Sequence, residues 1–236
     1  MMFRGGIGTG RAGWWRRKSR LAAPLLLIAL AGALQADWDF NLISQRAEKL
    51  YGPLGAGKAR IDDWQALLER LPTLDEPAQL EAVNRFFNAS LRFRDDIEIW
   101  HQNDYWATPV EALRIGAGDC EDFAIAKYFT LREAGVASEK LRITYVKALR
   151  LNQAHMVLTY YATPEAMPLV LDNLINVIRP ASGRSDLLPV YAFNAEGMWL
   201  AGKGGGKQVG DAKRLSRWQE LMKKMTAEGF PAESGR

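Results

Sequence analysis

The sequence is poor in thiol and imidazole side chains: its 236 residues include one cysteine and two histidines. A single cysteine excludes a disulfide within the chain, so Cys120 is either a small buried side chain or a reactive thiol. A cysteine nucleophile usually needs an imidazole to take up and return a proton. The choice of general base is therefore limited to His101 and His155.

Acidic residues are missing from the start of the chain, where none precedes Asp37. Six basic residues and an apolar run, Leu21–Leu34, occupy this segment, and small residues follow the run. This pattern predicts a secretory signal peptide over residues 1–36, cleaved after Ala36 or Ala33. An uncleaved membrane anchor is the alternative, and the shortness of the apolar run argues against it.

The net positive charge of the chain belongs to this export segment. The full sequence has 31 basic and 27 acidic residues, and all six basic residues of segment 1–36 would leave with it. The remainder, residues 37–236, then carries 25 basic and 27 acidic residues. We therefore exclude nucleic-acid binding and expect one domain over residues 37–236.

Apolar residues recur at helical spacing in the first half of the chain and at a period of two in the second. Helices are expected after Trp38, around Trp64 and after Asp75, which is a candidate N-cap. A last helix follows a glycine-rich segment, and its lysines and arginines are expected to face solvent. Helices followed by a meander of strands predict an α+β fold. The expected strands are 141–147, 154–161, 168–174 and 188–193.

A helix is also expected to begin at the cysteine. Asp119 suits the N-cap, and Gly135 ends the apolar stretch that follows. A loop rich in aromatic and acidic residues (92–107) and a capping box that begins at Thr108 precede this helix. Cys120 then occupies the first helical position, where unpaired N–H groups favour an anion. The acids beside it oppose a thiolate, which leaves their presence to be explained.

Two polar residues fall on predicted strands. His155 has apolar neighbours, so it is either a core histidine bonded to a carbonyl or a functional imidazole. Asp172 follows Val170 and Leu171, and a buried carboxylate there is costly unless it is paired. An edge position facing water is the alternative for Asp172, and the imidazolium of His155 is its natural partner.

Three strings of residues resemble the bacterial transglutaminase-like cysteine proteinases, of which the LapG-type periplasmic adhesin proteases are the best-known members. They are Trp106–Leu113 (WATPVEAL), Gly118–Phe129 (GDCEDFAIAKYF) and Ala154–Leu158 (AHMVL). The resemblance implies a papain-like fold in which an N-terminal helical part packs on an antiparallel sheet. It also implies a Cys–His–Asp triad formed by Cys120 as nucleophile, His155 as general base and Asp172 as the residue that orients the imidazole.

The resemblance further implies a calcium-dependent endopeptidase in the periplasm. Such an enzyme cleaves the N-terminal region of a large surface adhesin and releases it, which promotes biofilm dispersal. The periplasmic domain of an inner-membrane cyclic-di-GMP receptor captures and inhibits it. Asp119, Glu121 and Asp122 are the calcium ligands that the resemblance implies, and acids that only stabilise a helix N-terminus are the alternative.

Other interpretations stay open at this point. The same triad would serve a transglutaminase or an amidase acting on cell-wall peptides, and a calcium-stabilised binding module without activity is a further class. For the oxyanion, the backbone N–H of Cys120 is a candidate donor. Trp106 is a weaker candidate, with a core aromatic residue as its alternative role.

Overall fold

The computed structural model describes residues 38–200, 206–211 and 215–231. The predicted signal peptide, residues 1–36, lies outside the described residues and stays a prediction. Within the described ranges, no helix combines the length and the apolar content needed to cross a membrane.

The N-terminal half is helical, as the apolar spacing predicts. Trp64 lies at the centre of its core, fully buried and in edge-to-face contact with Trp38 and Phe40 at ring-centroid distances of 5.2 and 5.3 Å. Asp75 caps its helix by accepting a hydrogen bond from the Ala78 N–H at 3.0 Å. The helices of this half are α1 (Phe40–Tyr51), α2 (Gly57–Arg70), α3 (Glu76–Ser90), α4 (Asp96–Ile99), α5 (Pro109–Ile115) and α6 (Cys120–Glu133).

The C-terminal half forms an antiparallel sheet with strand order β6-β5-β4-β3-β7-β8-β9. Its centre is the hairpin of β3 and β4, in which Val146 pairs with His155. The strands of this sheet are β3 (Leu141–Ala148), β4 (Gln153–Tyr160), β5 (Leu169–Leu171), β6 (Arg179–Pro180), β7 (Leu187–Phe193), β8 (Met198–Leu200) and β9 (Lys207–Gly210). The α+β fold with a helical part packed on an antiparallel sheet is therefore confirmed.

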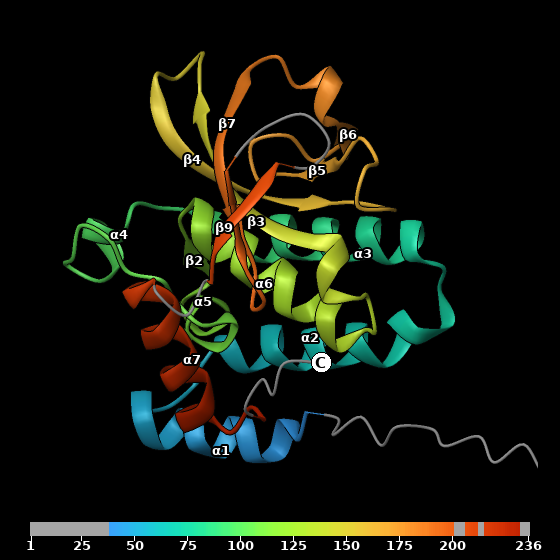
Figure 1. Ribbon diagram of the computed structural model, residues 1–236. Helices are drawn as coiled ribbons and strands as arrows, with labels where there is room; N and C mark the ends of the chain where they lie inside the picture. The colour runs from blue at the N-terminus through green and yellow to red at the C-terminus, as the bar shows by residue number, and fades with distance from the viewer. Residues whose placement is uncertain (1–37, 201–205, 212–214, 232–236) are drawn as a thin grey trace, which may run out of the picture. The chain divides into compact units, whose positions relative to one another are not determined.

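Helix α6 packs on the strands β4 and β3 of the sheet and on the helices α3 and α5 (Figure 1). One face of β4 carries Met156, Leu158 and Tyr160, which pack into the core shared with the helices. Val157 belongs to the opposite face, where it forms a second small cluster with Val146 and Val170. The alternation along β4 thus buries one face against α6 and leaves the other for a separate surface.

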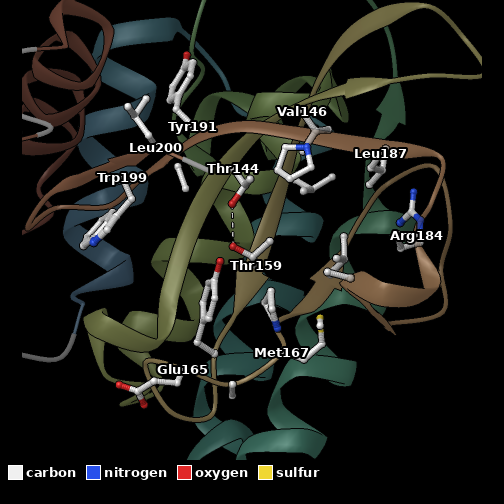
Figure 2. A pocket seen from close by; sticks show the side chains of 18 residues that line it. Thr144, Val146, Thr159, Glu165, Met167, Arg184, Leu187, Tyr191, Trp199 and Leu200 are labelled. Atoms are coloured by element: carbon white, nitrogen blue, oxygen red, sulfur yellow. Dashed lines mark hydrogen bonds between the residues drawn. The ribbon is translucent and has the colours of Figure 1, made fainter. Parts of the chain in front are cut away.

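That separate surface is hollowed into a mostly apolar pocket of about 290 Å³. Figure 2 shows Tyr191, Trp199 and Leu200 in one part of it and Arg184 with Leu187 in another. Thr144 and Thr159 bridge the neighbouring strands there, with 2.7 Å between their hydroxyl oxygens.

Three expectations need correction. The strand expected at 168–174 ends at Leu171, so Asp172 lies directly after β5 rather than in it. The segment 92–107 is not all loop, because it contains α4 and the strand β1 (Arg92–Phe93). β1 pairs in parallel with β2 (Ala117–Gly118), two residues ahead of Cys120.

The third correction concerns the last helix, α7 (Ser216–Glu228), whose basic residues do not all face solvent. Lys224 Nζ donates to the Trp106 carbonyl at 2.7 Å and to Glu111 at 2.8 Å. Arg217 Nε binds Asp104 Oδ2 at 3.1 Å. The helix therefore fastens the segment that precedes the cysteine.

Candidate active site

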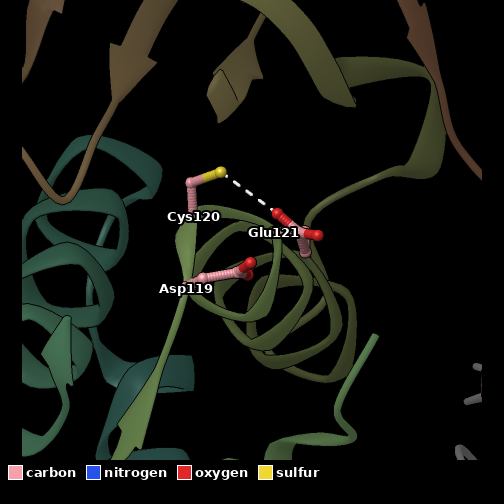
Figure 3. A group of neighbouring side chains, drawn as sticks. All are labelled: Asp119, Cys120 and Glu121. Carbon is pink, nitrogen blue, oxygen red and sulfur yellow. Dashed lines mark hydrogen bonds between the residues drawn. The ribbon is translucent and has the colours of Figure 1, made fainter. Parts of the chain in front are cut away.

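Cys120 is the first residue of α6, and Asp119 is its N-cap residue, as predicted. The capping box before it is also present: Thr108 Oγ1 accepts from the Glu111 N–H at 3.0 Å. Figure 3 shows Asp119 and Glu121 extending from the same turn as the thiol. Sγ of Cys120 donates a hydrogen bond to Glu121 Oε2 at 3.1 Å.

The surroundings of the thiol favour its protonated form. Burial, the charges of Glu121 and Asp119, and the hydrogen bond to Glu121 all raise the pKa of Cys120 well above its ordinary value. A hydrogen bond from the Met156 backbone N–H opposes this rise. Without a counter-charge for these acids, Cys120 is a thiol and not a thiolate at neutral pH.

His155 and Asp172 meet as the sequence predicts, with 2.8 Å between Nε2 and Oδ1. Both are buried, with 5% and 1% of their surfaces exposed. Because Nε2 faces the carboxylate, Nδ1 is the ring nitrogen left for another partner. Burial tends to raise the pKa of Asp172, but hydrogen bonds from His155, the Leu174 N–H and Arg184 lower it to about 2. Asp172 is therefore ionised at neutral pH.

The structure brings the thiol to the strand that carries the imidazole. The backbone N–H that reaches Sγ belongs to Met156, the residue after His155. Among the described residues, no hydrogen bond joins the Cys120 and His155 side chains; the thiol is bonded to Glu121 instead. The structure thus contains the predicted His155–Asp172 pair, while the thiol of Cys120 is held by a neighbouring carboxylate, and the triad as a unit stays a prediction.

The acids form a larger cluster than the one at the cysteine. Oxygen atoms of Asp96, Asp104 and Glu121 lie within 4.8 Å of one another, and so do those of Asp96, Asp119 and Asp122. Asp96 and Asp104 were not among the predicted ligands. The signal that could have found them is the density of acids in segment 92–107.

This cluster holds more negative charge than its surroundings compensate. Burial raises the pKa of Asp96 to about 6, and burial with the charges of Glu121 and Asp122 raises that of Asp119. Asp96 Oδ1 and Asp119 Oδ1 are buried and accept no hydrogen bond from the described residues. Hard oxygen donors with free lone pairs in a tight group fit Ca²⁺.

Asp122 has a structural task whether or not it contacts an ion. It is buried, and it accepts the Ala107 N–H at 2.7 Å and the Asp119 N–H at 3.2 Å. Burial first, and then the charge of Glu121, raises its pKa. Asp122 therefore joins the start of α6 to the loop ahead of α5 and has less capacity left for a ligand than Asp96.

Comparisons with known proteins indicate one family, by a family model and by solved structures. Residues 66–186 match the family model of the bacterial transglutaminase-like cysteine proteinases. The EGTA-treated structure of Legionella pneumophila LapG is 47% identical, with a TM-score of 0.69 over 79% of this chain and 97% of that one. The calcium-bound LapG structure is 45% identical, with a TM-score of 0.67 over 79% and 99%. No curated protein sequence matches the chain.

The chain belongs to the bacterial transglutaminase-like cysteine proteinases. Membership in this family of LapG-type proteases confirms the resemblance in the three sequence strings. The family is one of cysteine proteinases, and this chain offers Cys120 as its only thiol.

Trp106 and His101 are the two remaining candidates from the sequence. Trp106 is buried and stacked on Phe193 at 5.4 Å between ring centroids, which is the packing of a core aromatic residue. His101 is exposed and has a positive φ of 56°. Neither observation assigns a chemical role to these two residues.

Proposed function

We propose that this chain is a calcium-dependent cysteine endopeptidase of the periplasm. Its substrate would be the N-terminal region of a large surface adhesin, which cleavage releases and so promotes biofilm dispersal. Its regulator would be the periplasmic domain of an inner-membrane cyclic-di-GMP receptor. Support for this proposal comes from family membership, from similarity to LapG over nearly all of that chain, and from the predicted export segment.

The observation that carries the chemistry is the buried His155–Asp172 pair. The residue after His155, Met156, donates its backbone N–H to the thiol of Cys120. In the proposed reaction, Nδ1 of His155 takes the proton of Cys120, and the thiolate attacks the scissile carbonyl. The imidazolium then gives the proton to the leaving amine, while Asp172 holds the ring and stabilises its charge. The Cys120 backbone N–H, in the first turn of α6, faces the developing oxyanion.

This reaction requires the thiol to leave Glu121. A proton transferred from Sγ cannot reach His155 while the hydrogen bond to Glu121 Oε2 is made. Ca²⁺ would supply the positive charge that the acid cluster lacks. The residues that would hold it are Asp96, Asp104, Asp119 and Glu121, together with Asp122 as predicted from the sequence. Removing the charge of Glu121 from beside the sulfur lowers the cost of the thiolate.

Cleavage of a defined substrate tests the proposal. The protein without residues 1–36 is incubated with recombinant N-terminal segments of large surface adhesins, with Ca²⁺ or with EGTA, and products are located by mass spectrometry. We expect a single cut in the presence of Ca²⁺ and none with Cys120→Ala. Addition of a fluorescent primary amine separates hydrolysis from acyl transfer: incorporation of the amine without cleavage would support a transglutaminase instead.

A further inference from the structure

The carboxylate of Asp172 has a separate partner for each of its two oxygens. Oδ1 faces His155 Nε2 at 2.8 Å and also accepts the Leu174 N–H at 3.0 Å. Oδ2 accepts a hydrogen bond from Arg184 Nη2 at 2.7 Å. Only 2% of Arg184 is exposed, so water does not compete for this contact.

Arg184 is itself held in one orientation. Its Nε and Nη2 donate to the two oxygens of Asp186 at 3.0 and 2.8 Å, which fixes the plane of the guanidinium. Its backbone N–H donates to the Ala181 carbonyl at 3.0 Å, within the turn between β6 and β7. A chain of bonded groups therefore runs from Asp186 through Arg184 and Asp172 to His155.

We infer that Arg184 is a positioning residue for the proposed triad, which fixes the plane of the Asp172 carboxylate so that Oδ1 faces Nε2 of His155. This inference rests on the proposed function. A carboxylate that is hydrogen-bonded through one oxygen presents its other oxygen in a single orientation. The imidazole is therefore held with Nδ1 free for the thiol.

Stability alone does not account for an arginine at this place. Replacing a buried ion pair with apolar residues is often neutral or stabilising, because the pair loses its hydration. The remaining nitrogen, Nη1, is buried without a hydrogen-bond partner among the described residues, and the side chain forms part of the wall of the apolar pocket (Figure 2). An apolar side chain would suit that wall better, so the contact with Asp172 is what the arginine supplies.

The other buried cation near Asp172 cannot take over this role. Lys127 is fully buried in α6, and its charge acts on Asp172, but Nζ makes no hydrogen bond to the described residues. A charge without a directed bond stabilises the carboxylate in every orientation. Of these two cations, Arg184 makes the directed bond, and it is the group that orients Oδ2.

The test compares Arg184→Gln and Arg184→Lys with a matched control, Arg179→Gln. Gln keeps a donor without the charge, and Lys keeps the charge without the planar fork. Arg179 is an exposed arginine of β6, so Arg179→Gln makes the same change of side chain away from the contact with Asp172. For each variant, kcat and KM for cleavage, the rate of Cys120 alkylation by iodoacetamide between pH 5 and 8, and the melting temperature are measured.

If Arg184 positions Asp172, kcat falls by about tenfold or more in Arg184→Gln, less in Arg184→Lys, and KM is unchanged. Alkylation slows in the same order. In Arg179→Gln, kcat stays within about twofold of the wild type. Wild-type kcat in the folded Arg184 variants, or an equal loss of kcat in Arg179→Gln and Arg184→Gln, would overturn the inference. Should Arg184→Gln not fold, Arg184→Lys decides by the same criterion.

The alkylation arm keeps this inference separate from the proposed function. Alkylation requires no adhesin, so a wild-type protein that cleaves no adhesin still reports whether Arg184 affects the reactivity of the thiol. Conversely, the wild type could cleave an adhesin while the Arg184 variants keep the same kcat and the same alkylation rate. That result would support the proposed protease function and refute only the role of Arg184.

Discussion

At the scale of single residues, the hydrogen bond from Cys120 to Glu121 defines the state of the site: the thiol is bonded to Glu121 and not to His155. The thiol donates to a carboxylate on the next residue, while His155 is paired with Asp172. The proposed nucleophile and its proposed base are therefore both bonded, but to different acids. The proposed mechanism requires an exchange of partners in which the thiol turns from Glu121 to the free ring nitrogen of His155.

Substitution of the proposed triad tests this exchange. Cys120→Ala and His155→Ala should each lower the cleavage rate by at least about a thousandfold, and Asp172→Asn should retain a trace, because the orienting residue contributes less than the nucleophile. The exposed His101 provides the control: His101→Ala should keep near wild-type kcat. Cleavage by His155→Ala at a rate near that of the wild type would show that another group is the base.

The buried amine of Lys127 gives a prediction about stability. Burial lowers its pKa to about 7, against the opposing charge of Asp172, whereas the unfolded chain keeps the proton to a pKa near 10.4. Wild-type stability should therefore rise as pH increases from about 7 to about 10. Lys127→Met should be more stable than the wild type by on the order of a few kcal/mol below pH 7, and this excess should shrink toward pH 10.

Denaturant unfolding at several pH values measures this difference. Lys49→Met, at an exposed position of α1, is the matched control and should show no such pH dependence. An excess stability of Lys127→Met that is the same at pH 6 and pH 10 would contradict the lowered pKa.

At the scale of elements, the sequence was informative wherever one face of an element is buried. The stripe around Trp64, the caps at Asp75 and Asp119 and the alternation at His155 are local patterns, and the elements they predict are present. Local patterns do not report what a short segment pairs with. The β1–β2 pair and the early end of β5 were missed for that reason, because contacts distant in sequence decide them.

The same distinction between local patterns and contacts distant in sequence applies to the residues of the candidate site. Cys120, His155 and Asp172 could be proposed because each is unusual in its own local context. Arg184 could not, because it lies in a turn and gains its meaning only from the oxygen of Asp172 that it reaches. Asp96 likewise joins the other acids only through the fold.

Helix α7 depends on a buried acid for its attachment. Oε1 of Glu228 accepts hydrogen bonds from Tyr51 at 2.7 Å and from Thr108 at 2.6 Å. Burial, with the charge of Glu111 acting in the same direction, raises the pKa of Glu228 to about 8. An acid whose pKa is raised on folding stabilises the fold less as pH increases from its unfolded pKa, near 4.3, to its folded pKa.

Glu228→Gln should therefore be more stable than the wild type at pH 8, by on the order of a few kcal/mol, and similar to it at pH 4. The amide oxygen keeps both bonds to Tyr51 and Thr108 while the charge is gone. Thermal unfolding at the two pH values gives the comparison, and Glu220→Gln, at an exposed position of the same helix, is the control. A variant less stable than the wild type at pH 8 would mean that the ionised carboxylate holds α7.

At the scale of the whole molecule, the acid cluster joins three successive segments of the chain. Asp96 comes from α4, Asp104 from the loop after it, and Glu121 from α6. A cation bound by all three would tie the segment ahead of the cysteine to the helix that carries it. Its removal should affect both the fold and the thiol.

EGTA should therefore stop cleavage and lower the melting temperature, and excess Ca²⁺ should restore both. Mg²⁺ should restore them poorly, since it demands a tighter octahedral shell and gives up water reluctantly. Asp96→Asn and Asp119→Ala should weaken calcium uptake measured by calorimetry, whereas Asp95→Asn, exposed beside the cluster, should not. Full activity in EGTA with no uptake of calcium would leave only the role of acids at a helix N-terminus.

The pairing of β1 with β2 has a consequence for dynamics. Residues 92–118 form a loop that two backbone hydrogen bonds close. Arg92 N–H donates to the Gly116 carbonyl at 3.1 Å, and Arg94 N–H donates to the Gly118 carbonyl at 3.0 Å. This loop contains Asp96 and Asp104, and its end adjoins Cys120. Opening these two bonds would release the start of the acidic segment without unfolding the sheet or α6, while the contacts of Asp104 with Arg217 and of Ala107 with Asp122 hold its end.

The exchange rates of these two amide hydrogens should thus follow the occupancy of the cluster. We expect exchange at Arg92 and Arg94 to slow together when Ca²⁺ is added, while amides in the centre of β3 and β4 are unaffected. Mass-spectrometric hydrogen exchange on peptides that cover residues 92–94 makes the measurement. Local opening of this two-residue ladder would then loosen one side of the acid cluster, on a timescale separate from that of global unfolding.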